Sequence, residues 1–447
     1  MKYQTFQNCE MTSSSEEDSD HVLGNLFNIP VVNRGYSVWT ASIYIVSLMA
    51  GMGVLALPYA LAGAGWFGLP LIALACINSW YSAILLGRTW IMLEEKWEEY
   101  RGKFRYPYPA MGLRAAGPCM RYFVTATLHV TLIGVGVVYI LLCAQIVQSM
   151  TDQIYPLTYD TWIVILCICL CPLTWFGRFE EFWFAAIGAM VTAALACFML
   201  FAGTLLERSH LHAVVYKQPT FPSLSLSFGT ILFAFGGVFF FPNIQNDMSN
   251  RQQFNQATLL GFAGLLIFYL PVTITGYLVF GSTVSPNILL SIQEGYLRSS
   301  IEVCLAVHIL LAFLLVVNPV AQEIEDLLAV ASDFNYKRCF IRSTIMCLIL
   351  IIAYTIPHFD KVLNLIGGST MTLLTFIFPP LFYYLLNKDE VKLSYHSRTP
   401  FLEKIFLLQI IVTGIAGGIS CTYFAFMDII DVLTGENVAQ KAMNVSM

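Results

Sequence analysis

The sequence carries little charge. Only 11% of its 447 residues are charged, whereas 57% are hydrophobic. A soluble domain has about 25% charged residues, so this composition excludes a mainly water-exposed surface. Runs of roughly 20 apolar residues recur along the whole chain, and each is long enough to cross a bilayer. The sequence therefore predicts an integral membrane protein with many spans.

Sequence motifs of enzymes and channels are missing as well. There is no phosphate-binding Gly-rich loop with a lysine, no HExxH and no paired Cys/His set for a metal. No periodic polar stripe that could line a pore is present either. We therefore expect no enzymatic activity, no cofactor, no metal site and no nucleic acid partner.

The apolar runs predict eleven transmembrane helices in an all-α protein. We expect a disordered cytosolic tail over 1–36 that includes the acidic run SSSEEDSD, a membrane-spanning domain over 37–427 and a short tail over 428–447. The fourth and fifth runs meet at FGRFEE, which makes that boundary the least defined. The expected spans are 37–61, 66–93, 119–149, 158–177, 182–206, 223–246, 257–281, 299–324, 341–358, 362–387 and 404–427.

The positive charges indicate the orientation. If the N-terminus is cytosolic, most of the 23 Lys and Arg residues fall on the cytosolic side, with the largest group in the loop 94–121. This asymmetry follows the positive-inside rule. With an odd number of spans, the C-terminus then lies outside or in a lumen, where Asn444 begins a possible glycosylation motif. The plasma membrane and a lysosomal or vesicular membrane both fit.

The first and sixth spans carry glycines near their middle and a proline shortly after. The first reads GMGVLALPYA from Gly51, and the sixth reads FAFGGVFFFPNIQNDM from Phe233. In the predicted topology these spans run in opposite directions, so spans one to five and six to ten form two inverted halves. Interrupted helices at corresponding positions of two such halves indicate the binding site of a transporter.

Interrupted helices expose backbone groups. A break at Gly51–Gly53 leaves N–H groups at the start of the second half of the helix, and these attract a carboxylate. A break at Gly236–Gly237 leaves carbonyl groups that suit an ammonium. Such groups persist at membrane depth only where they line a cavity or bind a ligand, so the pair predicts a site for a zwitterion. Close helix packing is the alternative role for these glycines.

The same segments resemble signatures of the amino acid/auxin permease family. YLPVTITGYLVFGSTVSPNIL and LIGGSTMTLLTFIFPPLFYYLL are similar to the family's seventh and tenth spans, so the resemblance covers 34–427. It implies the five-plus-five inverted-repeat fold of the amino acid–polyamine–cation superfamily, with discontinuous first and sixth helices, and transport of amino acids. The proton-coupled and the vesicular amino acid carriers are the most similar subgroups.

The resemblance also implies which residues bind the substrate. First-span residues would hold its carboxylate through N–H groups, and sixth-span residues would offer carbonyl groups to its ammonium. These residues are Gly51, Met52, Gly53, Phe233, Ala234, Phe235, Gly236 and Gly237.

Ser47, His129 and His308 are the candidate residues for coupling transport to an ion. Sodium-coupled relatives have an asparagine where this chain has Ser47, and hydroxyl residues in the eighth span, where HILLAFLLVVNP has none. Because sodium needs hard oxygen ligands, this chain offers a poor sodium site. His129 and His308 lie inside spans and could carry a proton. The alternative is that each histidine only forms a hydrogen bond with a neighbouring helix.

Two expectations concern the cytosolic side. The segment 106–122 predicts a short interfacial helix that does not contact substrate. Water is expected to satisfy four carboxylates at the cytosolic span ends, namely Asp247, Glu323, Glu325 and Asp326.

Together these patterns predict a secondary active transporter in the lipid bilayer. We expect it to carry small neutral amino acids by alternating access, with a proton as the coupling ion. A sensor of amino acids with little net transport would use the same site, and a sodium-coupled carrier is the other alternative.

Overall fold

The computed structural model describes residues 35–102, 104–152, 154, 156–175, 183–207, 214–330, 334–393 and 400–434. The acidic run of the N-terminal tail, the motif at Asn444 and the boundary at FGRFEE fall outside these residues. Within them the regular structure is helical, and the one β-type pairing is an isolated bridge between Tyr36 and Met248. The predicted all-α class is confirmed.

The helices follow the expected spans. The first span is divided between α2 and α3, and the sixth is divided among α9, a 3-10 helix (Gly236–Phe240) and α10. The α-helices are α2 (Val38–Met49), α3 (Met52–Ala64), α4 (Gly68–Lys96), α5 (Pro107–Ala116), α6 (Pro118–Thr151), α7 (Tyr159–Trp175), α8 (Trp183–Glu207), α9 (Phe221–Ala234), α10 (Phe241–Asn246), α11 (Phe254–Phe280), α12 (Tyr296–Leu327), α13 (Tyr336–Thr355), α14 (Phe359–Ile366), α15 (Phe378–Leu393) and α16 (Phe401–Thr434).

Nine helical segments of the described chain are long and apolar enough to cross a membrane. Two further apolar helices are shorter, because α2 has 12 residues and α7 has 17. At 1.5 Å per residue, α7 rises about 26 Å, slightly less than the hydrocarbon core of a bilayer. The count of eleven spans therefore stays a prediction. At the other end of the domain, α16 continues to Thr434, beyond the expected end at 427.

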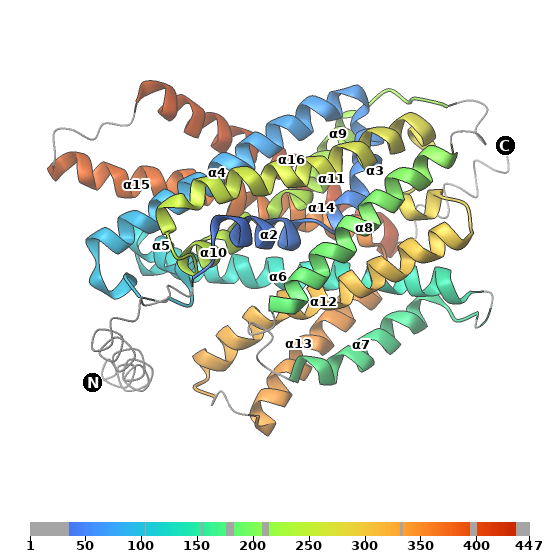
Figure 1. Ribbon diagram of the computed structural model, residues 1–447, viewed down its shortest axis with the longest axis horizontal. Coiled ribbons are helices and arrows are strands. Elements are labelled where there is room, and N and C mark those ends of the chain that lie inside the picture. Colours follow the sequence, from blue (N-terminus) through green and yellow to red (C-terminus); the bar gives the residue numbers. More distant parts are fainter. Residues whose placement is uncertain are drawn as a thin grey trace, which may run out of the picture.

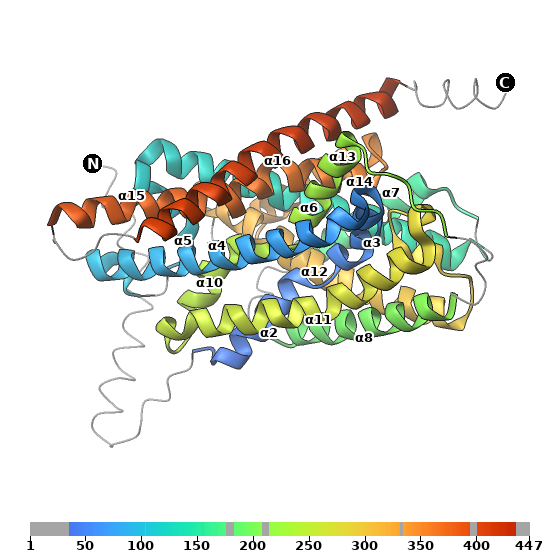
Figure 2. The ribbon, with the colours of Figure 1, turned by 90° about the horizontal axis from the view of Figure 1, so that it is seen from above.

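The helices of the two halves pack in matching pairs. The contact of α6 with α7 corresponds to that of α12 with α13, and the contact of α8 with α12 corresponds to that of α14 with α6. Likewise, α8 packs against α11 as α15 packs against α4. Figures 1 and 2 show most of these helices running along the long axis of the molecule, with α16 at one edge in Figure 2. Equivalent neighbours in both halves are what a five-plus-five repeat requires.

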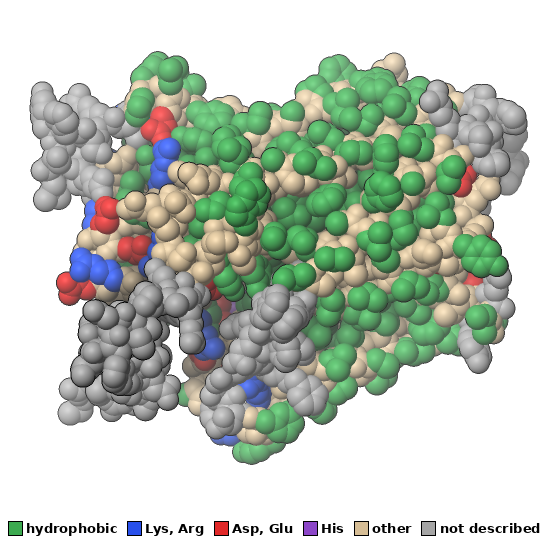
Figure 3. Space-filling view, viewed as in Figure 1, with side chains coloured by type: hydrophobic (Ala, Val, Ile, Leu, Met, Phe, Trp, Pro, Cys, Tyr) green, Lys and Arg blue, Asp and Glu red, His purple; other side chains and the backbone are tan. Residues whose placement is uncertain are grey.

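The outer surface is apolar along the flank of the bundle. Figure 3 shows hydrophobic side chains over the middle of this face, whereas Lys and Arg side chains gather at the end where α5 lies. Large apolar side chains on the surface include Ile267, which is 70% exposed, and Phe198, which is 68% exposed. A continuous apolar surface of this kind is stable in contact with lipid and would aggregate in water. The surface therefore agrees with a multi-pass membrane protein.

The tenth span contains two π-helical segments that the sequence did not indicate. They cover Gly367–Met371 and Leu373–Ile377, between α14 and α15. Gly367 packs directly against the backbone of Gly229 in α9. π-helical turns are rare and occur frequently at functional sites. Here the first of them carries Met371, which lines the cavity described next.

Candidate functional site

The first break lies one residue before the position that the sequence indicated. α2 ends at Met49, Ala50 is extended with φ −73° and ψ 118°, and α3 begins at Met52. The N–H groups in the first turn of a helix have no carbonyl partner in that helix. The discontinuity in the first span is therefore confirmed, and α3 presents its N-terminal end at this level.

The second break follows the end of α9. Phe235 leaves the helical conformation with φ −103° and ψ 10°, and the 3-10 helix then leads into α10. The carbonyl groups in the last turn of an α-helix lack partners within the helix. The predicted discontinuity in the sixth span is confirmed, and α9 presents its C-terminal end.

Glycines allow the two breaks to touch. A Cβ atom added to Gly53 would lie 2.7 Å from the Cα atom of Ala234, and one added to Gly237 would lie 2.7 Å from the Cγ atom of Met49. Both distances are too short for a real side chain. These glycines therefore serve close packing, the alternative left open by the sequence, and this packing brings both breaks to one place.

A cavity of about 40 Å³ lies between the breaks. We call it the central cavity. One water needs about 10–15 Å³ by this measure, so the space holds about three waters. The described residues that line it include none with a charged side chain. They are Leu48, Met49, Met52, Gly53, Leu132, Val135, Tyr139, Phe233, Ala234, Gly237, Phe239, Phe240, Val316 and Met371.

Tyr269 of α11 connects the two breaks, and the sequence interpretation missed it. Its hydroxyl lies 2.5 Å from the carbonyl oxygen of Met49 and 3.2 Å from that of Ala234. Its ring is fully buried and packs edge-on against Phe235. A hydroxyl has one proton, so it can donate fully to only one of these carbonyls at a time. The available signal was a tyrosine in the middle of an apolar span, because a buried hydroxyl requires a partner.

His308 of α12 lies against the first break. Its Nδ1 atom is 2.8 Å from the carbonyl oxygen of Ala189 in α8, and the ring is only 1% exposed. A carbonyl can only accept, so Nδ1 carries the proton of the neutral ring. Its Nε2 atom fills the space that a Cβ of residue 51 would occupy. Ser47, another predicted coupling residue, is buried in the last turn of α2, just before the same break.

His129 of α6 lies in a different environment. Its Nε2 atom is 2.9 Å from a carboxylate oxygen of Glu323 in α12, and the two side chains are 19% and 16% exposed. The Thr125 hydroxyl donates to the other oxygen at 3.3 Å. The structure therefore separates the two predicted histidines: His308 lies at the central site and His129 does not.

Glu323 lines a second cavity of about 100 Å³, which we call the α5-side cavity. It shares Leu132, Phe239 and Phe240 with the central cavity. These three side chains separate the two spaces. The other residues that line the α5-side cavity are Arg105, Tyr106, Pro107, Tyr108, Pro109, Leu128, Asn243, Pro319, Gln322 and Glu323.

The segment 106–122 contains the expected short helix, α5, but the first part of this helix is buried. Tyr108 is inside the protein and donates a hydrogen bond to the carbonyl oxygen of Leu374 at 2.5 Å. Just before α5, Arg105 and Tyr106 contact one carboxylate oxygen of Asp326 at 2.8 and 2.6 Å. The segment thus forms one wall of the α5-side cavity.

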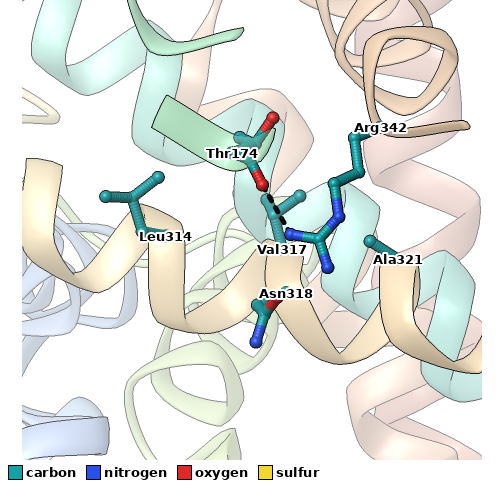
Figure 4. Close-up of a pocket in the computed structure, with 6 residues that line it drawn as sticks. All are labelled: Thr174, Leu314, Val317, Asn318, Ala321 and Arg342. Atoms are coloured by element: carbon teal, nitrogen blue, oxygen red, sulfur yellow. Dashed lines mark hydrogen bonds between the residues drawn. The ribbon is translucent and has the colours of Figure 1, made fainter. Parts of the chain in front are cut away.

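The expectation that water satisfies the carboxylates at this end of α12 is wrong for Glu325. This side chain is 7% exposed, accepts from Arg342 at 2.6 Å and lies 3.4 Å from the Nε atom of Arg338. Arg342 also donates to the carbonyl of Thr174, as the dashed line in Figure 4 shows. The reason is geometric, because α7 and α13 both pack against α12. A space of about 10 Å³, enough for one water, remains between Arg342 and Asn318.

The fold and the site define a class of protein. A helical membrane bundle with two matching halves, each led by a broken helix at one shared cavity, has the architecture of a secondary transporter. The chain belongs to the family described as transmembrane amino acid transporter protein, whose model matches residues 34–427. The family that the sequence resembled is thereby confirmed, and amino acid transport is supported as its general function.

Similar proteins include two amino acid transporters of Arabidopsis thaliana. The chain is 25% identical to amino acid transporter AVT1E over 423 residues, which covers 91% of this chain and 76% of that protein. It is 24% identical to amino acid transporter AVT1C over 414 residues, with coverage of 90% and 72%. Both similarities extend over most of each protein.

Solved structures support the fold. The structure of MhsT in complex with L-phenylalanine has a TM-score of 0.56 at 12% identity and covers 88% of this chain and 99% of that one. A mutant of the Eremococcus coleocola manganese transporter has a TM-score of 0.51 at 10% identity, with coverage of 92% and 93%. At this identity the likeness concerns the fold alone. The described part of the chain contains no group of three His, Cys, Asp or Glu residues placed to hold a metal ion.

Proposed function

We propose that this protein is a proton-coupled secondary active transporter of small neutral amino acids that works by alternating access. The observation that carries the proposal is the meeting of the two helix breaks at the central cavity. One break presents the N-terminal end of α3 and the other presents the C-terminal end of α9. A zwitterion complements these two ends, because each helix end attracts the opposite charge.

Individual residues would hold the two charges of the substrate. The N–H groups at Gly51, Met52 and Gly53 would bind the carboxylate. The carbonyl groups at the end of α9 and at the start of the following 3-10 helix would bind the ammonium. These groups belong to Phe233, Ala234, Phe235, Gly236 and Gly237.

The lining of the central cavity supports a small neutral side chain. Its described residues are apolar or aromatic, such as Val135, Val316 and Met371. Burying a charged side chain against them without a partner would cost several kcal/mol or more. The small volume of about 40 Å³ favours substrates with few side-chain atoms.

The two cavities support alternating access. Leu132, Phe239 and Phe240 are shared between them, so movement of a few side chains in this layer would join the spaces. Phe239 and Phe240 belong to the 3-10 helix that directly follows the second break. A ligand bound at this break could therefore influence the position of the layer.

His308 is our candidate for the coupling proton. Its Nε2 atom faces Gly51, beside the proposed carboxylate site, while Nδ1 is held by Ala189. Protonation of Nε2 would place a positive charge next to the bound carboxylate. Proton and substrate would then stabilise each other at this position, which is the requirement for coupling.

The orientation follows from the distribution of charge. Lys and Arg side chains gather at the α5 end in Figure 3, so we place this end and the N-terminus in the cytosol. The α5-side cavity then faces the cytosol. The C-terminus lies outside the cell or in an organelle lumen.

The proposal is tested with purified protein in proteoliposomes. Uptake of a panel of labelled amino acids is measured under a proton gradient and, separately, under a sodium gradient. We expect uptake of small neutral amino acids driven by the proton gradient. Uptake that requires sodium and ignores pH would contradict proton coupling, and specific binding without any flux would identify a sensor.

A further inference from the structure

The α5-side cavity has a polar wall as well as an apolar one. Phe239, Phe240 and Leu132 close it toward the central cavity, and Glu323 and Arg105 lie in its lining. The cavity therefore contains a carboxylate and a guanidinium. With a volume of about 100 Å³, it is larger than the central cavity of about 40 Å³.

The carboxylate of Glu323 is bound by titratable and polar groups of α6. One of its oxygens lies 2.9 Å from Nε2 of His129, and the other accepts from Thr125. This contact joins α6 to α12 at the edge of the cavity. The charge of this pair depends on the imidazole, because a histidine can gain or lose a proton near neutral pH.

The other charged groups at this end of α12 have partners of their own. From the segment before α5, Arg105 and Tyr106 contact Asp326. From α13, Arg338 and Arg342 contact Glu325. His129 is therefore the titratable side chain that pairs with Glu323. When His129 is neutral, the carboxylate carries a negative charge at the wall of a partly apolar cavity.

We propose that the α5-side cavity is a second, transient binding site for the transported amino acid, in which Glu323 binds the ammonium group and the proton on His129 competes for this carboxylate. The inference rests on the proposed function, because it requires that an amino acid leaves the central cavity past Phe239 and Phe240. A molecule that passes this layer enters a space with Glu323 in its wall. Arg105, in the same lining, is held by Asp326 and is not assigned a role in binding.

The competition has a defined direction. When His129 is protonated, its positive charge pairs with Glu323, and the ammonium loses its binding partner. When the imidazole is neutral, the carboxylate is available to the ammonium. Affinity at this site should therefore rise when the pH is raised.

The test compares the two faces of the transporter. Labelled alanine flux is measured from each face of oriented proteoliposomes without ion gradients, for the wild type and for Glu323→Gln. We expect the half-saturating concentration from the α5 face to rise about tenfold, since a hydrogen bond to a charged group contributes about 1.5–3 kcal/mol. The value from the opposite face should change less than about twofold. The maximal rate from the α5 face should not fall, because only ground-state binding at that face is lost.

Two further variants separate the possible causes. Asp326→Asn removes the same charge from α12 without touching the pair of Glu323 and His129, and should change the half-saturating concentration less than about threefold. An effect as large as that of Glu323→Gln would indicate general electrostatics and overturn the site. His129→Gln should remove the rise in α5-face affinity with rising pH, whereas the pH dependence that coupling through His308 causes at the opposite face should persist. Unchanged pH dependence would overturn the competition.

The measurements distinguish a wrong second site from a wrong proposed function. If the wild type moves no amino acid under any gradient, the proposed function is wrong and the second site falls with it. If the wild type transports alanine but Glu323→Gln shifts both faces equally, or neither, only the second site is wrong. A reduced maximal rate from the α5 face with an unchanged half-saturating concentration at that face would also reject it.

Discussion

The middle of α12 and its α5-side end hold ionisable side chains in different ways. In the middle, His308 contacts backbone, with Nδ1 at the carbonyl of Ala189 and Nε2 against Gly51. At the end, Glu323 and Glu325 contact side chains of neighbouring helices. Polar groups at membrane depth need partners, and the partner of His308 is a backbone carbonyl of the neighbouring helix α8. The middle of α12 therefore lies against the first helix break, and its α5-side end is joined to neighbouring helices by side-chain pairs.

The largest expected effect is on stability, which should fall much more in Glu325→Gln than in Glu323→Gln. Glu325→Gln leaves Arg342 and Arg338 buried without their shared carboxylate, which should reduce the free energy of unfolding by about 3–5 kcal/mol. Glu323→Gln should cost about 1 kcal/mol or less, because its pair is partly exposed and uses a histidine. Thermal unfolding in detergent compares the two variants. Equal destabilisation would contradict the distinction between a structural and a functional carboxylate.

The two histidines should differ in uptake. His308→Gln removes the imidazole at the first break, and we expect the ratio of maximal rate to half-saturating concentration to fall roughly 10- to 100-fold. His129→Gln should change this ratio less than about threefold when substrate enters from the face opposite α5. Proton-driven uptake of labelled alanine measures both values. A larger loss in His129→Gln would reverse the comparison.

A double-mutant cycle should show that His308 and Gly51 touch. Gly51→Ala places a methyl group where Nε2 of His308 lies, so uptake should fall about tenfold in the wild-type background. In a His308→Ala background the space is free, and the added Gly51→Ala should cost less than about twofold. Additive losses would mean that the two residues act independently.

The smallest effect concerns the hydroxyl between the breaks. Tyr269→Phe keeps the ring packed on Phe235 but removes the donor to the carbonyls of Met49 and Ala234. A loss of about 1 kcal/mol should raise the half-saturating concentration for alanine about fivefold. Thr275→Val is the matched control, because its hydroxyl donates within α11 to Pro271. An equal effect of both variants would remove Tyr269 from the site.

Much of the fold was predictable from local sequence. Apolar runs located the helices, because a spanning helix needs a continuous apolar stretch. The glycines at 51 and 236 located both breaks to within a residue or two, since glycine weakens a helix locally. The resemblance to the permease family agreed with the family that the chain belongs to. These signals are all contained within single spans.

The partners of individual side chains were not predictable. Tyr269 contacts Met49 and Ala234, which are far from it in sequence, and a single sequence contains no record of such contacts. Glu325 looked like a water-exposed residue at a span end, yet α7 and α13 cover it. The first π-helical turn between α14 and α15 packs against α9, which is likewise a contact between distant segments.

The proposed zwitterion site is tested most directly by changing the charges of the ligand. Equilibrium binding to the purified protein is measured for alanine, for alaninamide, which lacks the carboxylate, and for lactate, which has a hydroxyl in place of the ammonium. A site built from the N-terminal end of α3 and the C-terminal end of α9 needs both charges. We predict that each analogue binds at least about tenfold more weakly than alanine. Binding of either analogue as tight as that of alanine would contradict the account.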